Sequence, residues 1–123
     1  MARLVLDKHT VVPGDQIAYV IINDTDQPLA FGLGYGLEEQ TSNGWTETPV
    51  LDVFAAVGLG VDAGGTSLEM TATVPPNLRP ARYRISKRFW ADLPDDLPPH
   101  AREQCISAEF TVEPTPSIVT QPS

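Results

Sequence analysis

The sequence predicts an all-β fold, an antiparallel sandwich of about seven strands. Several segments alternate between apolar and polar residues, and a period of two residues is that of a half-buried strand. Turn signals rich in Gly, Pro, Asn and Asp separate these segments at intervals of roughly 8–12 residues. The 12 prolines and 9 glycines are spread along the chain as turns, and no segment has the pattern of a helix.

Length and charge restrict the possible functions. The 123 residues fit one domain that can bury a core without disulfides or a metal. The net charge of −8 disfavours nucleic-acid binding because an acidic surface repels phosphates. Cys105 is the only cysteine, so no disulfide can form within the chain. No apolar run approaches membrane-spanning length, and that of Met1–Asp7 is too short for a signal peptide, so we expect no membrane insertion here.

Three strands are predicted before the first hairpin. Arg3–Asp7 is short, and a Pro-Gly turn at Val12–Asp15 separates it from Gln16–Asn23, which is apolar on both faces near its end and therefore central. A polar loop ended by Pro28 leads to Leu29–Glu38, which has the clearest alternation in the chain. Its large apolar residues share one face. Its three glycines leave the other face bare, so that either something approaches closely there or the strand bends.

The middle of the chain contains a hairpin and a second alternating strand. A turn at Thr41–Gly44, with Asn-Gly at its tip, precedes the return strand Trp45–Thr48. The apolar stretch Pro49–Gly60 lacks clean alternation and is predicted to cover part of the core, with one helical turn at most. A turn at Asp62–Gly65 then precedes the strand Ser67–Val74. The predicted inward-facing residues of this strand are Leu68, Met70, Ala72 and Val74.

The stretch Leu78–Trp90 is predicted to be a tight corner followed by a long strand. Pro80 turns the chain, and Tyr83 then begins an inward-facing series in which Lys87 is the exception to the apolar pattern. A tyrosine at this position suits a sandwich corner, in which the ring packs inward and the hydroxyl reaches an upstream backbone group. The other reading of Tyr83 is a surface aromatic for binding.

A polar loop from residue 91 to 104 and a last strand, Cys105–Glu113, complete the predicted sandwich. The predicted inward-facing residues of the last strand are Ile106, Ala108, Phe110 and Val112. We expect residues 1–113 to form the domain and the proline-rich residues 114–123 to form a disordered tail or linker. About seven alternating strands in roughly 100 residues are typical of an immunoglobulin-like β-sandwich.

Several short motifs occur in a recognisable order over residues 4–112. They are Leu6-Asp7-Lys8, Pro13-Gly14-Asp15, Asn23–Pro28, Gly32–Glu38, Asn43-Gly44-Trp45, Gly64-Gly65-Thr66 and Pro80–Phe89, the last with Ala81 where Gly is usual. In these motifs the chain resembles a family of bacterial immunoglobulin-like domains found in cell-surface and secreted proteins. The resemblance implies a noncatalytic accessory module, an extracellular or cell-envelope location and no cofactor. The implied partner is another protein or a cell-envelope polymer.

Candidate partner-binding residues gather where the long strand meets its following loop. The basic run Arg79–Arg88 holds five of the eight Lys and Arg residues, which either bind an anionic partner or pair with glutamates such as Glu69, Glu103 and Glu109. Trp90 is either a binding anchor at the loop mouth or a cover for the end of the core, and Trp45 is expected to pack. The candidate partner-binding residues are Arg84, Lys87, Arg88, Phe89, Trp90, Gly64 and Gly65.

A second resemblance, to chagasin-type inhibitors of papain-like cysteine proteases, rests on two short loops. Asp62-Ala-Gly-Gly65 resembles the Gly-rich loop of these inhibitors and departs from it at the first glycine. Lys87-Arg-Phe-Trp90 resembles their Arg-Pro-Trp loop, with Phe89 in place of proline, and Asn23–Asp26 is a poor match to their third loop. The resemblance implies, as an alternative function, inhibition through three loops at one end of the sandwich.

The residues predict no catalytic site. No nucleophile elbow, phosphate loop or zinc-binding helix occurs, and the two histidines and one cysteine are a poor ligand set. A hydrolase fragment whose catalytic part lies elsewhere therefore remains only as a hypothesis about a larger protein. Acidic loop residues could supply oxygen ligands to calcium, although their spacing matches no known calcium motif. These residues are Asp24, Asp26, Asp92, Asp95 and Asp96.

Overall fold

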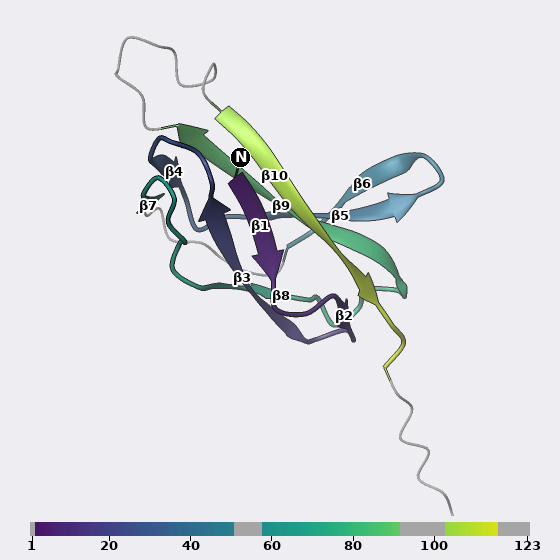
Figure 1. Cartoon of the computed structure of the whole chain (residues 1–123). Helices are drawn as coiled ribbons and strands as arrows, with labels where there is room; N and C mark the ends of the chain where they lie inside the picture. The colour runs from purple at the N-terminus through teal and green to yellow at the C-terminus, as the bar shows by residue number, and fades with distance from the viewer. Residues whose placement is uncertain (1, 51–57, 92–102, 116–123) are drawn as a thin grey trace, which may run out of the picture.

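The computed structural model describes residues 2–50, 58–91 and 103–115, and these residues form two β-sheets without any helix (Figure 1). One sheet has three strands in the order β1–β3–β8. The other has seven, in the order β2–β10–β9–β4–β7, with the β5–β6 hairpin also paired to β9. The strands are β1 (Ala2–Leu6), β2 (Thr10–Val11), β3 (Gln16–Asn23), β4 (Leu29–Phe31), β5 (Gly36–Thr41), β6 (Gly44–Thr48), β7 (Leu59–Val61), β8 (Met70–Thr73), β9 (Ala81–Ala91) and β10 (Glu103–Val112).

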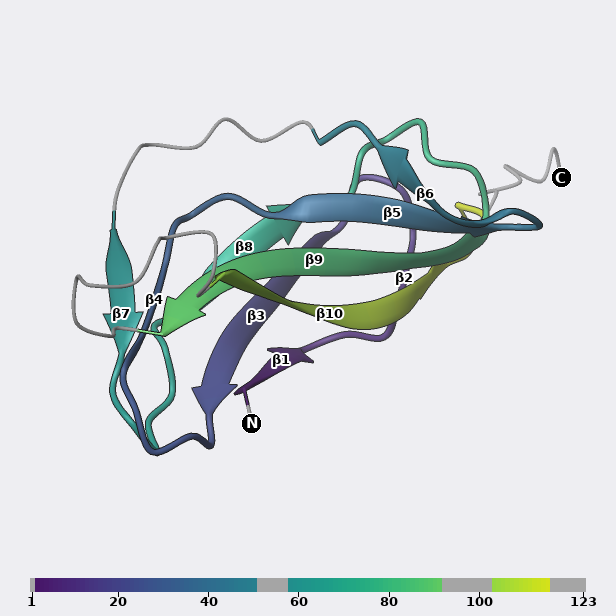
Figure 2. The same ribbon diagram turned by 90° about the horizontal axis from the view of Figure 1, so that it is seen from above.

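The predicted all-β immunoglobulin-like sandwich is confirmed. Figure 2 shows β9 between β5 and β10, and β9 is paired to β10 over ten residue pairs. All strand pairs are antiparallel except that of β2 with β10, which is parallel. Along the chain β2 follows β1 of the small sheet, but β2 pairs with the large sheet. The core lies between the sheets. Its most buried apolar side chains include Ile17, Tyr19, Ile21, Phe31, Tyr83, Ile85, Phe110 and Val112, each at most 2% exposed.

The strand predicted over Leu29–Glu38 is divided in the structure. β4 ends at Phe31 and β5 begins at Gly36, yet both strands pair with β9. Phe31 lies opposite Phe89 whereas Gly36 lies opposite Ser86, so four residues between the two strands face only two residues of β9. This excess of two residues is a β-bulge. The strand therefore bends, which was one of the two alternatives predicted for its bare face.

The bulge also redirects the side chains within it. Leu33 was expected to face inward and is only half-buried, whereas Tyr35 is 9% exposed and points into the core. The Tyr35 hydroxyl accepts a hydrogen bond of 3.1 Å from the backbone N–H of Thr73 in β8. Its ring meets that of Tyr19 edge-on, with 6.2 Å between centroids. Tyr35 therefore links the large sheet to the small one.

The strand predicted over Ser67–Val74 is shorter, and the inward orientation expected for Leu68 is wrong. β8 begins at Met70, and Ser67 rather than Leu68 is buried. The Ser67 hydroxyl accepts a hydrogen bond of 2.8 Å from the backbone N–H of Ile21 and donates one of 2.9 Å to the carbonyl of Leu68. Because a side chain takes the place of a backbone partner here, the ladder is interrupted and Leu68 turns outward, 52% exposed.

The corner predicted at Tyr83 is confirmed. Tyr83 is 1% exposed, and its hydroxyl donates a hydrogen bond of 2.8 Å to the backbone carbonyl of Arg79. The ring stacks on Phe110 of β10 with 5.9 Å between centroids. The three predicted glycine turns are also present, and each contains a glycine with positive φ. These are Gly14, Gly44 and Gly64.

Lys87 occupies the inward series of β9 and is completely buried. Its Nζ donates a hydrogen bond of 3.3 Å to the hydroxyl of Tyr19 and lies 5.5 Å from the ring centroids of Tyr19 and Phe31. Within residues 2–50, 58–91 and 103–115, no carboxylate forms an ion pair with it. Burial therefore lowers the pKa of Lys87 to about 8. A lysine in this position cannot present its charge to a partner at the surface.

Parts of three other predictions lie outside the described residues. They are the middle of the covering segment, residues 51–57, most of the polar loop, residues 92–102, and most of the tail, residues 116–123. Leu59 and Gly60, which were assigned to the covering segment, form β7 together with Val61, and β7 is an edge strand paired with β4.

We expect Tyr83→Phe to destabilise the domain by about 1 kcal/mol, because the substitution removes a buried hydrogen bond and leaves the Arg79 carbonyl without this donor. Urea unfolding followed by circular dichroism would measure the change. An unfolding free energy equal to that of the wild type would contradict the structural role of the corner.

Lys87 predicts a specific pH dependence of stability. The lysine pKa is lower in the folded state, about 8, than its ordinary value of 10.5, so the unfolded chain binds more protons between these values. The free energy of unfolding should therefore rise between these pH values, by about 3 kcal/mol from Lys87 alone. Lys87→Met should lack this rise. Lys8→Met, which removes an exposed lysine, is the matched control, and the same profile for both variants would contradict the assignment.

Candidate functional site

The outer face of β9 carries five side chains that point away from the core. Alternation along the strand places them between the inward residues that fill the sandwich, and they are Arg82, Arg84, Ser86, Arg88 and Trp90. Arg82 and Arg88 are exposed, and the other three are half-buried. The face lies in the middle of the large sheet, since β9 is flanked by β10 on one side and by β4 and β5 on the other.

The bulge creates a cavity on this side of the sheet. The cavity has a volume of about 410 Å³, within the range of small-molecule sites. We call it the glycine pocket, and it is lined by Gly32, Gly34, Tyr35, Gly36, Arg88 and Trp90. The detour of the chain opens the space, and the three glycines place no side chain in it. The bare face noted in the sequence thus lines a cavity beside two of the predicted binding residues.

A second hollow, of about 380 Å³, adjoins the glycine pocket. We call it the outer groove, and its lining includes Gly36, Glu38, Glu47, Arg84, Ser86 and Arg88, with Cys105 at the side of β10. Gly36 and Arg88 line both hollows. The two hollows therefore adjoin on the outer face of β9, and together we call them the depression.

Polar side chains in the outer groove are held by one another. Glu38 accepts hydrogen bonds from Nε of Arg84 at 2.9 Å and from the hydroxyl of Ser86 at 2.6 Å. These bonds, that of Arg84 first, lower the pKa of Glu38, so that it is a carboxylate at neutral pH. The Arg84 guanidinium lies 4.5 Å from the ring centroid of Trp45 in β6. Trp45 was expected to pack, and it does so against Arg84 while remaining half-buried.

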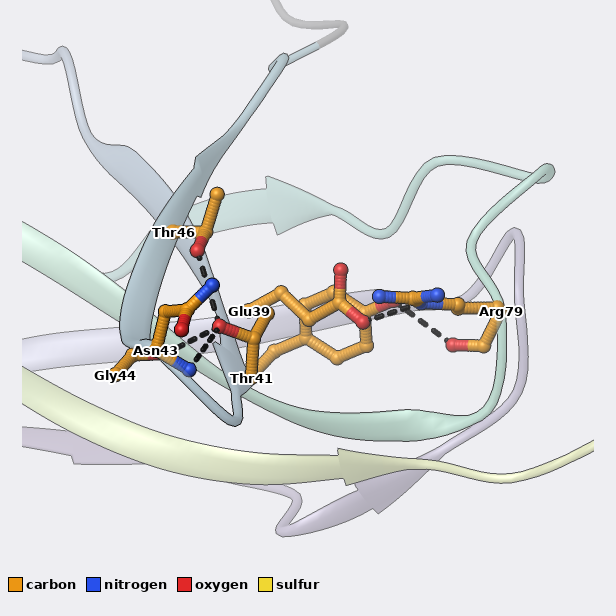
Figure 3. Close-up of polar contacts among 7 residues, drawn as sticks. Glu39, Thr41, Asn43, Gly44, Thr46 and Arg79 are labelled. Carbon is orange, nitrogen blue, oxygen red and sulfur yellow. Dashed lines mark hydrogen bonds and ion pairs between the residues drawn. The ribbon is translucent and has the colours of Figure 1, made fainter.

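The tip of the β5–β6 hairpin is anchored beside the corner that precedes β9 (Figure 3). Glu39 accepts a hydrogen bond from Nε of Arg79 in an ion pair. The Thr41 hydroxyl donates a hydrogen bond of 3.0 Å to the carbonyl of Gly44 and accepts one of 3.2 Å from the N–H of Asn43. The hairpin that walls one side of the outer groove is therefore fixed at its far end.

Three arginines of the predicted basic run are paired with glutamates, which was the alternative to binding an anionic partner. The pairs are Arg79–Glu39, Arg82–Glu109 at 2.7 Å and Arg84–Glu38 at 2.9 Å. Glu109 was among the glutamates expected in this role, whereas Glu38 and Glu39 were not. The run is consequently not a continuous stripe of positive charge, because these carboxylates lie beside it.

Loops gather at the end of the sandwich where β9 stops. Leu29 of β4 pairs with Val61 of β7 on one side and with Ala91 of β9 on the other. Asn23 is fully buried beneath the neighbouring loops, and its side-chain amide donates to the carbonyl of Gln27 at 2.8 Å. The same amide also donates to the carbonyls of Val61 and Asp62, at 3.3 and 3.1 Å. Asn23 thus joins the loop after β3 to the turn after β7.

Gly64 and Gly65, which were predicted to contact a partner, belong to that turn and line neither hollow. Gly64 has φ +72°, a conformation that other residues rarely adopt. A Cβ on Gly65 would lie 3.1 Å from the carbonyl oxygen of Asp62, and the Gly65 carbonyl accepts from the N–H of Asn23 at 2.9 Å. The tight turn itself therefore accounts for both glycines.

The structure brings together only part of the predicted set. Arg88 and Trp90 line the glycine pocket, and Arg84 lines the outer groove. Phe89, 3% exposed, and Lys87 lie in the core. The pocket and the groove add residues that the sequence analysis did not assign to a site, and the alternating glycines before β5 were the signal that could have found them. The added residues are Gly32, Gly34, Gly36, Glu38 and Glu47.

The acidic loops offer no preformed calcium site in the described part of the chain. Asp24 forms an ion pair of 2.9 Å with Arg3, and residues 92–96 lie outside this part. No cluster of three or more His, Cys, Asp or Glu side chains suited to a metal occurs among the described residues, where His9 and Cys105 are both exposed. No helix found there has the length and hydropathy needed to span a membrane.

Comparison with known proteins identifies a family. A model of the bacterial Ig-like domain matches residues 2–111. No curated protein matches the sequence.

Among solved structures, the chain is similar to two proteins of Caenorhabditis elegans. One is SSP-19, an MSP-domain protein like family member, with 14% identity, a TM-score of 0.49 and coverage of 85% of this chain and 92% of that chain. The other is WR4, an MSP family member, with 18% identity, a TM-score of 0.46 and coverage of 93% and 97%. A family 123 glycoside hydrolase from Clostridium perfringens is also similar, with 14% identity and a TM-score of 0.48, over 94% of this chain but 27% of the hydrolase.

Proposed function

Because this chain belongs to the bacterial Ig-like domain family, we propose that it is a noncatalytic accessory module that binds a partner for an exported or cell-surface protein. The partner is a protein or a polymer of the cell envelope. The site of binding is the depression formed by the adjoining glycine pocket and outer groove. The fold serves as a rigid frame for this surface, and the chemistry of the surface decides what it binds.

The position of the two tryptophans carries this proposal. Trp45 and Trp90 are the only tryptophans, and both are half-buried, associated with the outer face of one sheet. Tryptophan is usually highly buried, and it is enriched among residues that dominate binding energies. Trp90 borders the glycine pocket, which stays open because the glycines that line it have no side chains. Arg88 also lines this pocket. An aromatic ring and a guanidinium at a preformed hollow are the usual anchors of a binding surface.

Binding to cell-envelope fragments tests this function. Fragments of bacterial envelope, with their proteins and polymers retained, would be sedimented with the purified domain. We expect saturable co-sedimentation that the double substitution Arg88→Ala/Trp90→Ala weakens about tenfold or more, because both anchors are removed. Leu68→Ala is the matched control, since it removes an exposed large side chain that precedes β8 and lines neither hollow. Equal sedimentation of the double variant and the wild type would contradict the proposed site.

Protease inhibition is a second candidate function, and the clustering of loops supports it. The loop after β3, the turn at Gly64–Gly65 and the end of β9 lie at one end of the sandwich, as inhibition through three loops requires. Against it, Lys87 and Phe89 of the matching stretch are buried, which leaves Arg88 and Trp90 to contact a protease.

A papain assay separates the two candidates. An inhibitor of this type should abolish hydrolysis of a fluorogenic peptide by papain at micromolar concentrations of the domain, with loss of inhibition in Trp90→Ala. Full papain activity in the presence of excess folded domain would exclude this second function and leave the first one unaffected.

A further inference from the structure

We infer that the ligand of the glycine pocket and outer groove is a neutral carbohydrate chain. This inference rests on the proposed function and specifies its partner. Its basis is the joint presence of a bordering tryptophan, a glycine-lined cavity and a groove in which hydrogen-bond donors and acceptors alternate.

The backbone at the site excludes one common mode of protein recognition. An extended peptide often binds by adding a strand to an exposed sheet edge. β9 has no free edge long enough for a peptide strand, because β10 pairs with one side of it and β4 and β5 pair with the other, on either side of the two residues that face the bulge. A ligand in the depression is consequently recognised by side chains and by the bare glycine surface. The cavity of about 410 Å³ is a small, concave site rather than the flat patch of a protein interface.

The side chains present what a sugar requires. A sugar hydroxyl both donates and accepts hydrogen bonds, and the groove places the carboxylate of Glu38 within hydrogen-bonding distance of the guanidinium of Arg84 and of the hydroxyl of Ser86. The flat ring of Trp90 offers an apolar surface against which the C–H face of a pyranose can pack. Two adjoining hollows, one lined by Trp90 and the other by Arg84, suit several linked sugars rather than one.

Charge favours a neutral chain over a polyanion. The lining of the depression contains two arginines, Arg84 and Arg88, and two glutamates, Glu38 and Glu47. The Arg84–Glu38 pair neutralises one charge of each sign within the groove. The net charge of the whole chain is −8, which repels an anionic polymer at longer range.

Gly36 allows the site to be filled without straining the fold. A Cβ added there would meet Cβ of Ser86 at 3.7 Å, an ordinary contact, and the residue does not have a positive φ. Ser86 is the cross-strand partner of Gly36 and points outward, so the added side chain would enter the depression. A β-branched residue also suits a strand. Gly36→Val should therefore fold normally and obstruct both hollows.

The experiment uses chitohexaose and cellohexaose, two neutral β-1,4-linked oligosaccharides, as probes. We expect at least one of them to bind saturably, as measured by calorimetry, and to shift the indole N–H resonance of Trp90 in NMR spectra. Gly36→Val should weaken this binding about tenfold or more while keeping the wild-type melting temperature. Gly60→Val is the control, because its Cβ also meets only an ordinary contact, 3.5 Å from the Leu29 carbonyl, and Gly60 lines neither hollow.

Two results would overturn the inference. One is the absence of saturable binding and of a Trp90 shift with both oligosaccharides. The other is unchanged affinity in a folded Gly36→Val variant. If Gly36→Val does not fold, the Trp90 shift in the wild type still decides. If envelope fragments bind and lose binding in Arg88→Ala/Trp90→Ala while neither oligosaccharide binds, the proposed module stands and its partner is a protein or another envelope polymer, so the two failures are distinguishable.

Discussion

Two short strands, β4 and β5, pair with the same side of β9 in registers that differ by two residues. This slip in register produces the bulge and the cavity beside it. β4 and β5 satisfy the backbone of β9 on either side of the slip, and the chain between them must bulge. Within the bulge Tyr35 keeps the inward side that alternation predicts, and its hydroxyl reaches the opposite sheet. On the outer face the bulge leaves the cavity beside Arg88 and Trp90. One irregularity in the hydrogen-bond ladder therefore organises both the core and the candidate site.

The sequence is sufficient to predict features that depend on local patterns. Period-two alternation predicted the two strands of the long β9–β10 pair, and the order of turn residues predicted the corner at Tyr83. The family match over residues 2–111 agrees with the motifs identified along the chain. In the motif Asn23–Pro28, the structure explains the asparagine: its buried side-chain amide donates hydrogen bonds to three carbonyls of the adjoining loops. Such a role is local in space but not in sequence.

Features that depend on register could not be predicted. Alternation continues through Leu29–Glu38 whether the strand is continuous or bulged, because only its pairing with β9 reveals the slip. Leu68 fits the inward pattern, yet the hydrogen bonds of Ser67 turn it outward. Alternation along β9 places Lys87 on the inward side, whereas its charge suggested the surface. The inward position holds in the structure, because aromatic rings and the Tyr19 hydroxyl surround the buried ammonium.

The parallel pairing of β2 with β10 has a mechanical consequence. Thr10 and Val11 lie beside Thr111 and Val112, and both strands run in the same direction. Tension that draws the chain backwards out of β2 and forwards out of β10 acts along the strands in opposite directions. The hydrogen bonds between them are then loaded together in shear, rather than opened one after another as in a hairpin pulled from its ends. Under such tension the chain would carry force through β2 and β10, while the pairing of β5 with β9 stays intact.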